Sequence, residues 1–190
     1  MGVTGNWSGY EESGSGWTET WLAYYEPTLG NTNCSDPAVG FWDGIGDKSN
    51  ALGQSGTVSG LDSGALHQLF HENLPGNPSF PGVTVPPNTQ VISEVLYDGS
   101  NTWSYDMNVG GDNYYYGGSG GYDGSVTEAI TEMPIGYSLM NFNEPVTMTS
   151  YVGRGLAPMN PTTKDTMPGY DTVSGISSGS FTVTHDSCSG

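Results

Sequence analysis

The segment Ser125-Val-Thr-Glu-Ala-Ile-Thr-Glu-Met-Pro134 carries two acidic side chains, Glu128 and Glu132, in an otherwise apolar and β-branched pattern. It opens with Ser-x-x-Glu, a capping box that begins some helices, but its proline would end such a helix after about two turns. The β-branched residues favour a strand instead. Alternate side chains of a strand share a face, so both acids would point the same way as Val126 and Ile130. A buried carboxylate is costly unless it is partnered, which makes this strand the first candidate for a functional site.

Short strand-like segments recur along the rest of the chain, separated by turns rich in Gly, Pro, Asn and Ser. Strand patterns occupy residues 17–25, 38–42, 52–58, 90–97, 102–109, 145–152 and 180–185. Residues 65–74 fit either a helix or a strand, and residues 81–86 an edge strand or a loop; turns or loops are expected at 43–50, 98–101, 110–124 and 153–178. The pattern predicts an all-β fold, an antiparallel sandwich or barrel, in a single domain spanning residues 1–190.

Acidic residues dominate the charge of the chain. It contains 20 Asp and Glu against 3 Lys and Arg, a net charge of −17 at pH 7. This surface would repel nucleic acids and anionic membranes, so neither is an expected partner. No apolar run approaches the ~18 residues of a membrane span. Most of the carboxylates would protonate near about pH 4, so the composition suits acidic surroundings, although a secreted or halophilic protein would show the same bias.

Two cysteines, Cys34 and Cys188, stand far apart in the sequence. Two thiols are too few for a structural zinc site of the usual kind, so no metal is expected from them. They predict one disulfide, and with it an oxidising, extracellular environment, or else two buried free thiols. Met1-Gly-Val-Thr4 has neither the basic start nor the apolar core of a signal peptide. We therefore expect a mature secreted domain with an added Met.

Two local motifs suggest chemistry but carry little weight. His67-x-x-x-His71 has the spacing of metal ligands on a helix, but it lacks the glutamate of the zinc-protease motif and only one other histidine exists. Gly175-Ile-Ser-Ser-Gly179 matches a nucleophile elbow. A chain so rich in Gly and Ser produces that match by chance, and no helix is predicted after it.

Paired carboxylates are a stronger possibility. A glycosidase needs two of them within about 10 Å of each other. Glu128 and Glu132 would lie ~13 Å apart on one strand, which is too far. A glycosidase would therefore need a partner for Glu132 from another strand, such as Glu72 or Glu94. The aromatic residues could also serve as sugar platforms, so a carbohydrate-active sandwich, glycosidase or lectin, remains the alternative function.

Several motifs in order resemble the glutamic peptidases, the eqolisin family. They are Asn6-Trp-Ser-Gly-Tyr10, Phe41-Trp42 followed by Gly44-Ile45, Leu52-Gly-Gln-Ser-Gly-Thr57, Glu72-Asn-Leu-Pro75, Thr127-Glu-Ala-Ile-Thr-Glu-Met-Pro134 and Asn141-Phe142. The resemblance runs from about Asn6 to Val183. It implies a sandwich of two curved antiparallel sheets, similar to the concanavalin A-like, jelly-roll type. It also implies an acid endopeptidase that acts on polypeptides as a monomer and without a cofactor.

The resemblance assigns roles residue by residue. Gln54 and Glu132 match the catalytic dyad of the family. Trp7, Trp42, Phe70 and Glu72 match positions that line the substrate cleft. The chain departs from the family pattern in three places: Phe70 and Ala129 stand where the family usually has Trp, and Gly44-Ile-Gly-Asp47 replaces a Gly-Ile-Asp-Gly turn.

This dyad would suit acidic conditions. A general base works best when its pKa lies near the operating pH, and in acid a histidine would be fully protonated. Glu132 as a carboxylate would take a proton from the attacking water and return it to the leaving amine. The neutral amide of Gln54 would donate to the developing oxyanion at any pH, and one such donor is worth ~3–4 kcal/mol in related sites. Read without the resemblance, both residues fit a simpler interpretation, as hydrogen-bonded polar groups on a sandwich face.

Overall fold

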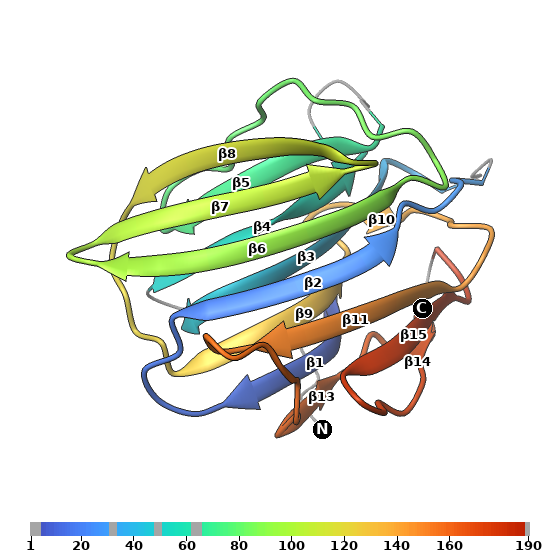
Figure 1. Ribbon diagram of the computed structural model, residues 1–190. Helices are drawn as coiled ribbons and strands as arrows, with labels where there is room; N and C mark the ends of the chain where they lie inside the picture. The colour runs from blue at the N-terminus through green and yellow to red at the C-terminus, as the bar shows by residue number, and fades with distance from the viewer. Residues whose placement is uncertain (1–4, 31–33, 48–50, 62–65, 189–190) are drawn as a thin grey trace.

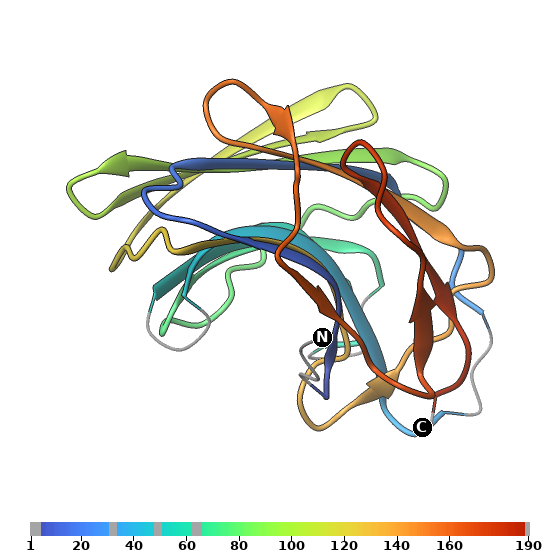
Figure 2. The same cartoon turned by 90° about the horizontal axis from the view of Figure 1, so that it is seen from below.

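Two β-sheets stack face to face and bend in the same direction in the computed structural model of this protein (Figures 1 and 2). The structure describes residues 5–30, 34–47, 51–61 and 66–188. Within these ranges the chain forms 15 strands and no α-helix, which confirms the all-β prediction. The described residues accordingly contain no helix of the length and apolarity that a membrane crossing requires.

The first sheet has the strand order β13-β1-β9-β3-β4-β5. Its strands are β1 (Trp7–Ser13), β3 (Pro37–Asp47), β4 (Ala51–Ser59), β5 (Gln68–Leu74), β9 (Val126–Glu132) and β13 (Thr163–Asp165), with the short β10 (Ser138–Leu139) parallel to β3. The second sheet has the order β14-β15-β11-β2-β6-β7-β8. Its strands are β2 (Glu19–Tyr25), β6 (Gln90–Gly99), β7 (Thr102–Val109), β8 (Asp112–Ser119), β11 (Val146–Val152), β14 (Asp171–Val173) and β15 (Ser180–His185), with β12 (Ala157–Pro158) beside β11. Long-range antiparallel pairings join the central strands of both sheets, as predicted for a sandwich.

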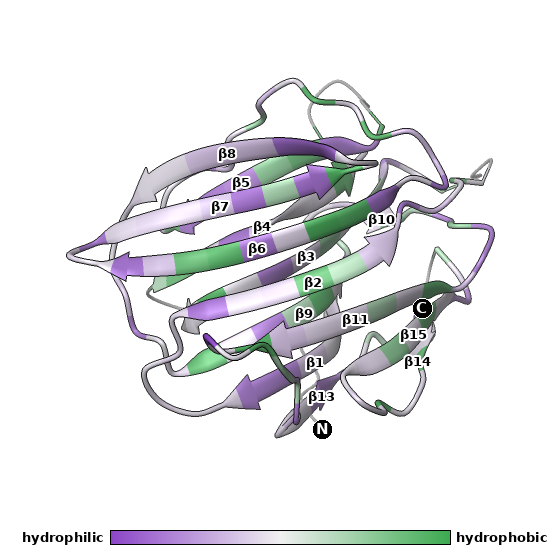
Figure 3. Cartoon of the chain, viewed as in Figure 1, coloured by the Kyte–Doolittle hydropathy of each residue, from purple (hydrophilic) through white to green (hydrophobic). Residues whose placement is uncertain are grey.

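The main core lies between the two sheets and follows the alternation of strand side chains. Along β6, hydrophobic segments alternate with hydrophilic ones (Figure 3), and Val91 and Val95 are fully buried. Leu22 of β2 and Phe41 of β3 meet in the same core. The inward residues of one sheet thereby pack against those of the other.

The central strands of the first sheet are covered on both faces. All nine residues of β4 are buried, as are six of the seven residues of β9. One face of these strands packs against the second sheet. The other face carries a separate apolar cluster, and its buried members are Trp42, Leu52, Val58, Phe70 and Ile130. This second cluster, on the side of the first sheet turned away from the second, is where the predicted site residues gather.

Three expected loops are partly strand. The predicted turn over residues 43–50 is wrong in its first half, because β3 continues to Asp47 in register with β4. The predicted loop over residues 110–124 contains β8, which pairs along its whole length with β7. Its Tyr and Gly residues still alternate in exposure, but this is an edge strand with little burial and so with a weak apolar pattern. The predicted loop over residues 153–178 contains the short strands β12, β13 and β14.

A disulfide joins Cys34, just before β3, to Cys188, just after β15, with their Cα atoms 5.8 Å apart. The prediction of a bonded pair is thereby confirmed, and the alternative of two free thiols is wrong. The bridge links the first sheet to the C-terminal end of the second.

Candidate active site

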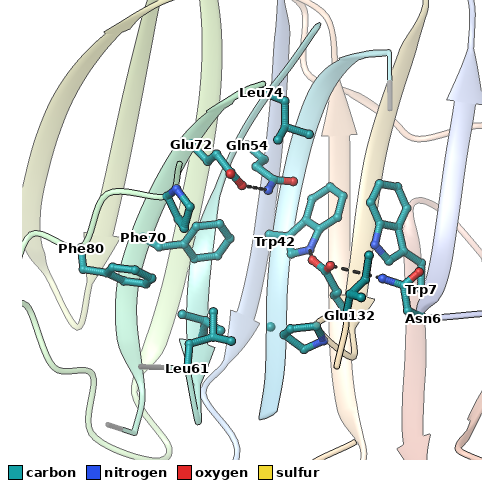
Figure 4. A pocket seen from close by; sticks show the side chains of 15 residues that line it. Asn6, Trp7, Trp42, Gln54, Leu61, Phe70, Glu72, Leu74, Phe80 and Glu132 are labelled. Atoms are coloured by element: carbon teal, nitrogen blue, oxygen red, sulfur yellow. Dashed lines mark hydrogen bonds between the residues drawn. The ribbon is translucent and has the colours of Figure 1, made fainter. Parts of the chain in front are cut away.

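The registers of three neighbouring strands bring Gln54 and Glu132 to the same face of the first sheet. Gln54 of β4 lies opposite Gly44 of β3, and Glu132 of β9 lies opposite Gly40 of β3. Trp42 stands between these two glycines on the same face. Figure 4 shows Gln54 and Glu132 on either side of the Trp42 ring. Residues 78 positions apart in sequence thus face one another across a single indole.

These side chains line a cleft of about 370 Å³. All six sequence-predicted site residues border it, namely Trp7, Trp42, Gln54, Phe70, Glu72 and Glu132. The remaining lining residues are Asn6, Gly40, Val58, Leu61, Leu74, Pro78, Phe80, Pro134 and Ile135. The structure therefore brings the predicted residues together; the roles assigned to them remain predictions.

Glu132 is held by donors from two strands and the segment before β1. The indole Nε1 of Trp42 donates to Glu132 Oε2 at 2.9 Å, and the Asn6 amide donates to Oε1 at 3.4 Å. Burial raises the pKa of Glu132 above its ordinary value, and the charge of Glu72 acts in the same direction. Hydrogen bonds from Trp7 and Trp42 oppose the shift because they stabilise the carboxylate. The site therefore holds Glu132 as a more basic carboxylate than an exposed glutamate, in a fixed orientation.

Gln54 is fixed from the other side of the cleft. Its Nε2 donates to Glu72 Oε2 at 2.5 Å, and the two residues are direct partners in the β4–β5 ladder. The amide oxygen of Gln54 is buried and has no hydrogen-bond partner among the described residues. Burial raises the pKa of Glu72, while the bond from Gln54 lowers it. The cleft thus holds the Glu72 carboxyl group against the Gln54 amide and the Glu132 carboxyl group on the other side of the Trp42 indole.

Aromatic and aliphatic side chains form the walls. Trp7 packs edge-on against Trp42, with ring centroids 4.8 Å apart and the planes at 81°. Phe70 and Phe80 lie together on the opposite side, with Leu61 below them (Figure 4). A largely apolar wall of this kind excludes water from the polar groups and provides room for apolar substrate side chains.

Glycines leave the floor of the cleft open around Trp42. Gly56 lies between Trp42 and Phe70 in the cross-strand row, and a side chain there would collide with the main-chain oxygen of Phe41. Gly40 has more room. A Cβ at Gly40 would lie 3.6 Å from Trp42 Cδ1 and 3.9 Å from the Cβ of Glu132, which is ordinary van der Waals contact. The packing around position 40 therefore does not require a glycine. The missing side chain leaves space in the cleft beside Glu132.

Sequence reasoning missed several lining residues. Asn6 adjoins the predicted Trp7, but its bond to Glu132 depends on how the chain enters β1. Phe80 and Ile135 belong to segments between strands. Ile135 follows Glu132 by three residues but lies beyond the strand, whereas Phe80 is distant from Glu132 in the sequence. The isolated aromatic residue in a Pro- and Gly-rich stretch was the one available signal for Phe80.

The other candidates lie elsewhere. The His67 ring bonds Glu26 at 2.7 Å, while His71 stacks between Tyr105 and Tyr116. Within the described residues no group of three or more His, Cys, Asp or Glu side chains could hold a metal. The Gly175–Gly179 segment forms a tight turn that leads into β15.

Two further positions from the sequence analysis also lie outside the cleft. Glu94 lies on β6 of the second sheet, paired with Asp106 of β7. Ala129, one of the departures from the family pattern, packs into the core between the sheets and does not reach the cleft.

Comparison with known proteins identifies the architecture. No protein-family model matches the sequence, and no curated protein does. Among solved structures, scytalido-glutamic peptidase with a transition state analog inhibitor superposes with a TM-score of 0.77 at 16% identity, over 97% of this chain and 100% of that one. The same peptidase with a peptide-based transition state analog gives 0.76 at 18% identity, with the same coverage. SCP-B, a member of the eqolisin family in complex with the tripeptide Ala-Ile-His, gives 0.71 at 15% identity, again over 97% and 100% of the two chains. The chain therefore has the fold of the glutamic peptidases.

Proposed function

We propose that this protein is an acid-active glutamic endopeptidase that cleaves polypeptides without a cofactor. The observation that carries the proposal is the placement of Gln54 and Glu132 on either side of Trp42, in an apolar cleft of a chain with this fold. The solved structures with the same fold hold peptide-based transition state analogues or a tripeptide, which supports a polypeptide substrate.

The contacts support a water-based mechanism. Glu132, with its pKa raised by burial, acts as the general base that removes a proton from water. The hydroxide attacks the scissile carbonyl carbon, and the negative charge gathers on the carbonyl oxygen. An N–H of Gln54 donates to that oxygen. Protonated Glu132 then transfers its proton to the leaving nitrogen, which restores the carboxylate and releases two peptides.

The disulfide supports an extracellular location for the proposed peptidase. Disulfides persist in oxidising compartments, so the Cys34–Cys188 bridge supports secretion from the cell. An acidic extracellular environment would also suit the strongly acidic composition.

The test is cleavage of an unfolded protein substrate over about pH 3 to 7, in the presence of pepstatin to silence aspartic peptidases. We expect Glu132→Gln to abolish cleavage and Gln54→Ala to reduce kcat by about 10²–10³-fold, the usual cost of one oxyanion donor. Glu94→Gln is the matched control, because Glu94 is a partly buried glutamate on the other sheet. A folded wild type that cleaves no peptide bond anywhere in this range would overturn the proposal.

The carbohydrate-active alternative has one observation in its favour, because Glu72 and Glu132 border the same cleft. A glycosidase would need both carboxyl groups. In that case the wild type would hydrolyse a polysaccharide, and Glu72→Gln and Glu132→Gln would each abolish the activity. In a glutamic peptidase only Glu132→Gln would do so.

A further inference from the structure

Besides lining the cleft, Glu72 accepts a hydrogen bond from the side chain of Gln54. Its Oε2 lies 2.5 Å from the Nε2 of Gln54, and the two residues sit opposite each other in the β4–β5 ladder. The main chain of Glu72 is fixed as well, because the Tyr105 hydroxyl donates to its carbonyl oxygen at 2.9 Å. The carboxylate is therefore held against the amide by strand pairing and by a bond from the second sheet.

The two ends of a glutamine amide are chemically opposite. Nε2 carries two donor hydrogens, whereas Oε1 can only accept. A half-turn about the last side-chain torsion of Gln54 would exchange them and present lone pairs to a developing oxyanion. While Glu72 is ionised its carboxylate can only accept, so it selects the orientation in which Nε2 is turned toward it. One hydrogen bonds Glu72, and the second hydrogen remains for another acceptor.

The buried oxygen of Gln54 makes this selection necessary. Oε1 is shielded from solvent and has no hydrogen-bond partner among the described residues. Burying such an acceptor without a partner is unfavourable, so the observed orientation needs a compensating interaction. The hydrogen bond to a carboxylate provides it, since charge-assisted bonds are about twice as strong as neutral ones.

We propose that Glu72 is a positioning residue of the proposed peptidase, which binds one N–H of the Gln54 amide and so keeps the second N–H, not the amide oxygen, available to the reacting carbonyl oxygen. The inference rests on the proposed function for its catalytic meaning. The Glu72–Gln54 contact itself does not depend on that function.

Glu72 also acts on Glu132 through its charge. The negative charge of Glu72 contributes to the raised pKa of Glu132. The titratable groups that face Glu72 are Glu132 in the cleft and Tyr105 behind it, and burial raises the pKa of Tyr105, which keeps that hydroxyl neutral. The adjacent His71 stacks on Tyr105 and Tyr116, on the other face of β5. Removing the charge of Glu72 should therefore lower the pKa of Glu132.

Two substitutions separate orientation from charge. Gln at position 72 can still accept from Gln54 but has no charge, whereas Leu fills similar space and cannot accept. We expect Glu72→Leu to lower kcat by ~10- to 100-fold with little change in KM, because a misoriented donor is lost in the transition state. Glu72→Gln should keep most of kcat, and the acid limb of its kcat/KM profile should move to lower pH. Glu94→Gln should change neither quantity. Wild-type kcat in Glu72→Leu together with an unmoved acid limb in Glu72→Gln would overturn the proposal.

A second measurement needs no activity. In ¹⁵N-labelled protein, the side-chain NH₂ signals of Gln54 can be assigned by their loss in Gln54→Ala. One amide proton should lie downfield in the wild type and move upfield when acid protonates Glu72. That downfield signal should be absent in Glu72→Leu and should not titrate in Glu72→Gln. Identical, pH-independent signals in all three proteins would show that Glu72 does not orient Gln54. A wild type without peptidase activity that still shows this titration would sink the proposed function and leave the contact established.

Discussion

Trp42 is the residue on which the geometry of the cleft depends. Its indole is fully buried, separates Gln54 from Glu132, and donates to the Glu132 carboxylate. If Glu132 is the base of the proposed peptidase, this donor would keep its carboxylate in one orientation toward the attacking water. The donor also limits how far burial can raise the pKa of Glu132.

Trp42→Phe keeps an aromatic ring but removes the N–H. Without that donor the pKa of Glu132 should rise further, because the hydrogen bond favours the charged form. If Glu132 is the base of the proposed peptidase, the acid limb of kcat/KM moves to higher pH, in the direction opposite to that expected for Glu72→Gln. The measurement is the pH profile of peptide cleavage, with Trp103→Phe as the matched control, because Trp103 is equally buried but lies outside the cleft. An acid limb at the wild-type pH would contradict this role of Trp42.

Gly40 controls the space beside Glu132. Alanine fits there at contact distances of 3.6 to 3.9 Å, but its methyl group would occupy the floor of the cleft. Gly40→Ala should leave stability nearly unchanged, and Gly40→Val should narrow the site further. Both should shift cleavage in a peptide library toward smaller side chains next to the scissile bond, with the larger shift for valine. Gly117→Ala, on the exposed strand β8, is the control, and an unchanged cleavage pattern in Gly40→Val would show that no substrate side chain enters this space.

At the scale of elements, the sequence predicts the strands that have one buried face and one more exposed face. β7 and β15 follow the expected bounds closely, because buried and half-exposed residues alternate along them. β9 was identified from its β-branched residues, although it is buried on both faces. β8 was missed because it is an exposed edge strand, and the far half of β3 because Gly44 and Gly46 resemble turn residues. The far half of β3 also pairs with β9, a strand distant in the sequence, which no local pattern reveals.

The Cys34–Cys188 bridge joins elements that are far apart in sequence, with a separation of 154 residues. Cross-links that close long loops stabilise chiefly by restricting the unfolded chain, typically by about 2–5 kcal/mol. The double variant Cys34→Ser, Cys188→Ser should lose stability of this order in urea unfolding. The cleft lies on strands β1, β3, β4, β5 and β9, so the proposed peptidase activity should persist at low urea concentration. Dithiothreitol should destabilise the wild type but not the variant, and equal urea midpoints for the two proteins without reductant would contradict the prediction.

At the scale of the whole molecule, the candidate site was predictable only in part. The resemblance to the glutamic peptidases predicted Gln54, Glu132 and four lining residues, whereas their local context alone fits hydrogen-bonded polar groups on a sandwich face. The contacts that give them a defined chemistry, from Trp42 to Glu132 and from Gln54 to Glu72, arise from strand registers that no local pattern specifies. Charge could be predicted as an overall balance, and the strand pattern indicated burial of Glu128 and Glu132, whereas the burial of Asp43, Asp171 and Glu94 could not be predicted.

That burial gives the whole molecule a pH dependence of its own. Burial raises the pKa of Asp43 well above its ordinary value of 3.8, that of Asp171 to about 6, and that of Glu94 to about 7. These groups are protonated more readily in the folded than in the unfolded chain. Their contribution to stability is therefore complete below about pH 4 and is lost as pH rises through the folded-state values.

The free energy of unfolding should consequently fall between about pH 4 and pH 7, by on the order of 3 kcal/mol from Asp171 alone. Asp43→Asn replaces an ionisable group that is fully buried between the sheets with a neutral one of the same shape. The variant should lose less stability than the wild type over this range, while Asp112→Asn, at an exposed position, should follow the wild type. Urea unfolding at a series of pH values measures the slopes, and parallel slopes for wild type and Asp43→Asn would contradict the prediction. Protonation of Glu132 would limit the proposed activity on the acid side. The loss of stability caused by the buried Asp43, Asp171 and Glu94 would limit it toward neutral pH.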